Sequence, residues 1–150
     1  MKRLTPLLFC AALTAAASAQ GEGGLYIAGG NFDFTQAIDR AIAQHPTPSK
    51  FFVLVTGDAV RALSVVAPPE LVEVRNMGAK HGAVYLVCRR DVDRELFRMN
   101  ELISSVVAVR GWPPPGTDEL PPGKNYYPNE DPANLPRSTE LLRRLRATCS

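Results

Sequence analysis

The sequence has few of the residues that build metal sites, disulfide scaffolds or charged binding surfaces. Its 150 residues include three cysteines, two histidines and one tryptophan, and the formal net charge is +2. Three cysteines are too few for a scaffold in which many bridges replace a hydrophobic core. Neither His45 nor His81 has a cysteine or carboxylate at a close metal-ligand spacing. The sequence therefore predicts no metal site, and we expect no cofactor.

Several motifs that carry chemistry are also missing. No serine stands in a G-x-S-x-G elbow, which removes support for acyl-transfer hydrolysis. The glycine-rich stretch AGGNF, at residues 28–32, lacks both the G-x-x-x-x-G-K-[ST] pattern and a full G-x-G-x-x-G. Its glycines are better explained by a tight turn that leaves a sheet. The apolar run from Leu7 to Ala17 is too short to span a bilayer, so no membrane span is predicted.

That apolar run belongs to an expected secretory signal peptide. Residues 1–19 have a basic start at Lys2 and Arg3 and end with an A-x-A-like pattern, so we expect cleavage after Ala19 and a periplasmic or secreted protein. Cleavage lowers the count of Lys and Arg from 17 to 15, equal to the 15 acidic residues. A neutral protein has no general electrostatic attraction to nucleic acid or to anionic membranes. It would retain two cysteines, Cys88 and Cys149.

The rest of the chain alternates short apolar segments with segments of helical periodicity. Strands are predicted at 25–28, 51–56, 83–88 and 106–109, and helices at 34–44, 59–63, 70–80, from 91 to about 103, and from 138 onward. Asp33 is placed to cap the first helix, with Gln36 as its capping-box partner. Asp91 and Ser138 are placed to cap the last two.

This order predicts one α/β domain with a mostly parallel sheet of four to five strands and helices on both faces. The domain is expected to cover residues 20–112. Residues 113–136 contain eight of the 13 prolines and are predicted to be an extended segment. Residues 137–150 are predicted to form a helix that packs on the domain or extends it.

The carboxyl ends of parallel strands meet at one edge of a sheet, where ligands bind in such folds. The binding residues expected at this edge are Asn31, Gly57, Asp58, Arg89, Arg90 and Trp112. Asp58 has two interpretations, as a group that orients a substrate or as the cap of the short helix at 59–63. Trp112 contacts a partner in one interpretation and packs its own loop onto the core in the other.

Cys88 is the candidate catalytic residue at the same edge. It follows a strand, precedes a helix and is adjacent to Arg89 and Arg90, and all three features favour a thiolate over a thiol. Cysteine is also among the most buried residue types, so a structural role stays open. A third alternative is a disulfide bond with Cys149, which could also act as a resolving residue.

The segments LYIAGG, FFVLVTGDAVRAL, GAVYLVC and ISSVVAVRGW resemble, in this order, the DsrE/DsrF-like family, which includes TusD-type sulfur-relay proteins. The resemblance extends from Leu25 to about Gly111. It implies a three-layer flavodoxin-like fold and assembly into dimers, trimers or hexamers. It also implies that Cys88, at the position of the family's relay cysteine, accepts sulfur as a persulfide.

Three functions follow as hypotheses. In the first, the protein is a periplasmic persulfide carrier or sulfurtransferase accessory, and Cys88 exchanges sulfane sulfur with a periplasmic donor or acceptor protein. In the second, it is a non-catalytic oligomeric binding module, and Cys88 is structural or bonded to Cys149. In the third, it has a thiol–disulfide role with Cys149 as the resolving residue. The sequence does not decide whether the protein is an enzyme.

Overall fold

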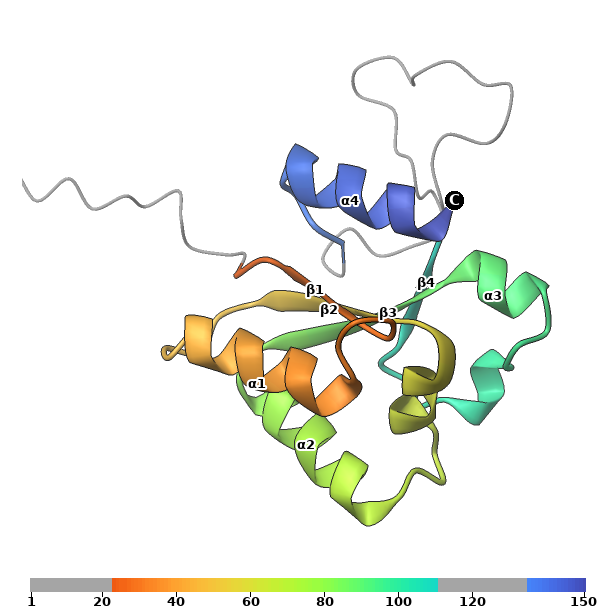
Figure 1. Cartoon of the computed structure of the whole chain (residues 1–150), viewed down its shortest axis with the longest axis horizontal. Helices are drawn as coiled ribbons and strands as arrows, with labels where there is room; N and C mark the ends of the chain where they lie inside the picture. The colour runs from red at the N-terminus through yellow and green to blue at the C-terminus, as the bar shows by residue number, and fades with distance from the viewer. Residues whose placement is uncertain (1–22, 111–134) are drawn as a thin grey trace, which may run out of the picture.

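A computed structural model describes residues 23–110 and 135–150 (Figure 1). These residues contain a four-stranded, all-parallel sheet in the order β1-β2-β3-β4. The strands are β1 (Leu25–Ala28), β2 (Phe51–Val55), β3 (Ala83–Cys88) and β4 (Val107–Val109). The helices are α1 (Phe34–Gln44), α2 (Pro69–Lys80), α3 (Arg89–Asp93) and α4 (Thr139–Cys149), with 3-10 turns η2 (Gly57–Leu63) and η3 (Met99–Glu101).

The strands are adjacent in the order in which they occur along the chain. Right-handed crossovers between successive strands of such a sheet all run over the same face. Figure 1 shows this arrangement, with α1 and α2 together on one side of the sheet and α4 on the other. The predicted parallel sheet with helices on both faces and a C-terminal helix is therefore confirmed. α4 packs against the second face of the sheet (Figure 1).

The core between the sheet and the crossover helices is the larger of two hydrophobic clusters. The inward side of α1 follows the predicted spacing, since Phe34, Ala37, Ile38 and Ala41 are all buried. Every residue of β2 is fully buried, as expected of a strand covered on both faces. Leu71 and Val74 of α2, predicted to face inward, pack partly buried against this cluster.

The second core lies between the sheet and α4. Phe52, Leu54 and Leu86 project from the sheet into it, and Leu145 of α4 is fully buried against them. Leu141 and Leu142 pack at its margin, so the side of α4 predicted to be apolar is the side that contacts the sheet. Leu135, assigned from sequence to the extended segment, also belongs to this core.

Three helix starts match the sequence. Asp33 Oδ1 accepts a hydrogen bond from Gln36 N at 2.8 Å, and Gln36 Oε1 accepts one from Asp33 N at 3.0 Å, which completes the predicted capping box. Ser138 caps α4 by accepting from Leu141 N. Pro69 occupies the first turn of α2, where a missing amide costs no helical hydrogen bond.

Two local predictions are wrong. Asp58 is not a helix cap: η2 begins at Gly57, its N-cap residue is Thr56, and Asp58 lies in the first turn. The helix predicted from Asp91 to about 103 is broken into α3, a loop and η3, and Asp91 is not its cap, since α3 begins at Arg89 and Asp91 lies inside it. Glu95 adopts a positive φ of 59°, which ends the helical path after α3 and turns Leu96 outward. Leu96 is consequently 66% exposed, although its spacing had placed it on the buried side.

A buried arginine joins α2 to the end of η2. Arg75 is 9% exposed, and its Nη1 donates to the backbone oxygens of Ala62 at 2.9 Å and Ser64 at 3.0 Å. The Tyr85 hydroxyl donates to the Arg75 carbonyl at 2.6 Å. Burial raises the pKa of Tyr85, more than the nearby Arg75 charge lowers it, so the hydroxyl stays protonated as a donor.

Replacing Arg75 by methionine tests this connection. The substitution keeps an apolar stem but leaves two carbonyl oxygens without their donor, so we expect the free energy of unfolding to fall by about 3 kcal/mol. Urea denaturation measures this loss, and the dependence of the unfolding free energy on urea concentration should stay unchanged. The matched control is Lys80→Met at the exposed end of the same helix, and an equal effect of both substitutions would contradict the assignment.

Candidate functional site

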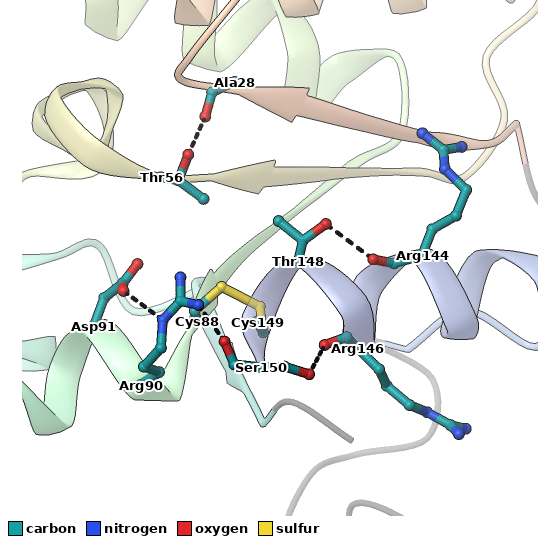
Figure 2. Close-up of a disulfide and its surroundings, with 10 residues drawn as sticks. All are labelled: Ala28, Thr56, Cys88, Arg90, Asp91, Arg144, Arg146, Thr148, Cys149 and Ser150. Atoms are coloured by element: carbon teal, nitrogen blue, oxygen red, sulfur yellow. Dashed lines mark hydrogen bonds and ion pairs between the residues drawn. A yellow bond between two sulfur atoms is a disulfide. The ribbon is translucent and has the colours of Figure 1, made fainter. Parts of the chain in front are cut away.

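Cys88 ends β3 and forms a disulfide with Cys149 in the last turn of α4 (Figure 2). The two Cα atoms are 5.1 Å apart and the residues are separated by 61 positions in the chain. Cys88 has no exposed surface, and Cys149 is 2% exposed. Both side chains belong to the core between the sheet and α4. The structure therefore shows a sealed disulfide where the sulfur-handling hypothesis requires a solvent-open thiolate.

Arg90 reinforces the same junction. Its Nε lies 3.2 Å from Asp91 Oδ1, and its Nη1 donates to the backbone oxygen of Ser150, the residue after Cys149. Figure 2 shows Arg90 between Asp91 and the end of α4, beside the disulfide. Asp91 is 5% exposed, so its carboxylate is held by a partner as a buried charge requires. Arg90 thus anchors α4 to the end of β3.

Arg89 makes no comparable contact. It opens α3 and is half-buried, and its Nε has no hydrogen-bond partner within the described residues. The two arginines next to Cys88 consequently differ in role. The expectation that both stabilise a thiolate gains no support, since the sulfur they flank is bonded.

The remaining predicted binding residues lie at the carboxyl ends of β1 and β2. Asn31, Gly57 and Asp58 are all exposed there. Gly29 has a φ of 108°, and a Cβ at this position would collide with Thr56, so the close approach of two strand ends explains the glycine. Trp112 lies outside the described residues, as do the expected signal peptide and residues 113–134.

Two hollows flank η2 at this edge. The first, of about 420 Å³, lies between the β1–α1 turn and η2, and its polar lining includes Asp33, Asp58 and Arg61. The second, of about 580 Å³, lies between η2 and the segment that follows α3, and it is lined by Val60, Phe97 and Leu102 together with Asp58, Arg61 and Glu101. Asp58 and Arg61 border both hollows, so one short 3-10 turn supplies their shared charges.

Three exposed apolar side chains are found in or near the second hollow. Val65, Val66 and Leu96 are 61%, 84% and 66% exposed. Leu96 lines the hollow itself, and Val65 N donates to Glu101 O at 2.9 Å on its rim. Large apolar side chains that gather at one place on a surface mark interaction sites more often than single ones do. The sequence pattern missed the exposure of Leu96 because it placed this residue in the core.

The histidines have local partners. His45 Nε2 lies 2.8 Å from the Tyr26 hydroxyl, and His81 Nδ1 lies 3.0 Å from Met77 O. Across residues 23–110 and 135–150, no group of three His, Cys, Asp or Glu side chains is placed to hold a metal ion. None of the helices described is long and apolar enough to cross a membrane.

Comparisons of the chain with models of protein families, with curated proteins and with solved structures gave no significant match. The resemblance to the DsrE/DsrF-like family stays a prediction.

Loss of the disulfide is expected to destabilise the protein strongly. A bridge that closes a loop of this length raises the free energy of the unfolded chain by about 4 kcal/mol. The double variant Cys88→Ser, Cys149→Ser should therefore lose stability of this order. Guanidinium denaturation of oxidised protein, reduced protein and the double variant gives the comparison. Equal stability of all three forms would contradict a structural role for the bond.

Proposed function

We propose that the protein is a non-catalytic, exported interaction module that self-associates, and that Cys88 serves its architecture. The observation that carries this proposal is the Cys88–Cys149 disulfide, which is buried in the core beneath α4. A disulfide sulfur is neither a thiolate nucleophile nor a persulfide acceptor until it is reduced. The bond thus favours the structural interpretation of Cys88.

The position of α4 explains why such a bond is useful. The crossover helices cover one face of the sheet, and α4 covers the other. Without α4, the apolar side chains of Phe52, Leu54 and Leu86 would face water. A single helix of 11 residues is marginal in isolation, and a covalent link with the Arg90 anchor holds it in place. Secretion to an oxidising compartment, as the expected signal peptide implies, suits this device.

The exposed apolar side chains of Val65, Val66 and Leu96 support self-association. Leu96 lines a hollow that offers further apolar side chains together with an acid and a base, Asp58 and Arg61. An interface that combines an apolar centre with a charged rim has the composition typical of protein–protein contacts. In a symmetric dimer the same surface of both copies meets, so each copy supplies the apolar side chains and the charged residues to the interface.

Sulfane-sulfur transfer through Cys88 is the competing function. It needs a dithiol reductant to cleave the bond and movement of α4 away from the end of β3, because both cysteines are buried. In that case the second hydrophobic core would open in every cycle. The interaction module needs neither step, so the geometry favours it.

Sedimentation velocity of the purified protein tests self-association. We expect a concentration-dependent oligomer, and we expect Val66→Asp or Leu96→Asp to raise its dissociation constant about tenfold or more by placing a charge in the interface. Met77→Asp is the control, since Met77 is an exposed apolar residue of α2 that does not line the hollow beside η2. A wild type that is monomeric at all concentrations, or a Leu96→Asp protein that associates as the wild type does, would contradict the proposal.

A further inference from the structure

The outer side of β1 borders a groove between two helices. β1 is the first strand of the sheet, and no strand among residues 23–110 and 135–150 pairs with its outer side. The groove has a volume of about 600 Å³ and extends along β1 from Gly23 to Ile27. Residues of α1 form one wall, and Arg144 contributes from α4 on the opposite side of the sheet.

The backbone of β1 has hydrogen-bonding groups directed to this groove. Phe52 N donates to Gly24 O at 2.9 Å, and Thr56 N donates to Ala28 O at 2.9 Å, so alternate residues of β1 face β2. By the two-residue period of a strand, the amides and carbonyls of Leu25 and Ile27 face away from β2. At the next outward position Gly29 N donates to Phe32 O, which closes that end. Leu25 is only 4% exposed, so the outward-facing backbone that a further strand can reach is short and centred on Ile27.

The charges at the groove are of one sign. Arg40 and Arg144 both line it, and no aspartate or glutamate does. Within the described chain neither guanidinium forms an ion pair, although Arg40 lies over the Phe32 ring at 4.1 Å. Edge strands are often protected by charged side chains against pairing with further chains. Here Arg40 and Arg144 lie on opposite walls of the groove and leave the strand edge open. Their charges favour a negatively charged partner segment.

Tyr26 fixes the α1 wall of the groove. Its hydroxyl lies 2.6 Å from Gln44 Oε1 and 2.8 Å from His45 Nε2, so it donates to the amide oxygen and accepts from the imidazole. Its ring also contacts Phe51 edge to ring at a centroid distance of 5.9 Å. The end of α1 is thereby tied to β1, and a wall held in this way gives a groove that is formed before binding.

We propose that this groove binds an extended acidic segment of a partner protein, which adds a strand to the outer side of β1. The segment exchanges hydrogen bonds with the outward-facing backbone of β1, centred on the amide and carbonyl of Ile27, the mode known as β-augmentation. Its carboxylates pair with Arg40 and Arg144. A second copy of the chain fits less well, since β1 pairing with its own symmetry mate brings the cationic walls of two copies together. This site is separate from the surface proposed for self-association.

Fluorescence anisotropy of the full chain, with a labelled, end-blocked peptide of alternating valine and glutamate about eight residues long, tests the proposal. We expect saturable binding that weakens about three- to tenfold in Arg144→Glu and in Arg40→Glu, and that weakens as salt rises. Arg143→Glu is the matched control, because Arg143 is the neighbouring exposed arginine of α4, does not line the groove and pairs with Glu140 at 3.3 Å.

The backbone contacts are tested on the peptide, so that protein folding is not at risk. Alternate amides of a bound strand face β1, and the others face away from it. Methylation of the first set removes the donors to β1, whereas methylation of the second set does not. We expect only the first methylated peptide to lose binding. Equal binding of both methylated peptides would overturn strand addition. Equal binding to wild type, Arg144→Glu and Arg40→Glu would overturn the acidic partner. If the unliganded chain forms a dimer that Ile27→Pro abolishes, the groove binds a second copy of the chain, and the proposal of an acidic partner is overturned.

Discussion

The covalent link between the end of β3 and the end of α4 is the constraint on which the structure depends. The sheet orders its strands as the chain does, so the crossover segments fall on one face and leave the other to be covered from elsewhere. Cys88–Cys149 and the Arg90 contact to Ser150 bring α4 to that face. The same bond removes the reactive thiol that the position of Cys88 suggested.

Much of the fold could be predicted because its signals are local. The spacing of Phe34, Ala37, Ile38 and Ala41, and the Asp33 capping box, depend only on residues within α1. The continuous apolar run of β2 likewise required burial on both faces. Strand order has no such signal, since the same alternation of strands and helices is compatible with several orders.

The candidate site was harder to predict because its contacts are distant in the chain. Cys88 and Cys149 are separated by 61 positions, and a disulfide between them was one of three alternatives. The role of Arg90 could not be inferred, because its partner Ser150 comes beside it only when α4 docks. Leu96 was misplaced for a different reason: the positive φ of Glu95 breaks the helical period that would have buried it.

Peptide mapping of the protein, purified from an oxidising compartment and alkylated under denaturing conditions without reductant, tests the central claim most directly. The disulfide account predicts one peptide that joins Cys88 to Cys149, with neither cysteine alkylated. Reductant added before alkylation should separate the two and label both. Alkylated Cys88 in the unreduced protein, or Cys88 carrying an additional sulfur, would contradict the account and favour sulfur chemistry at the end of β3.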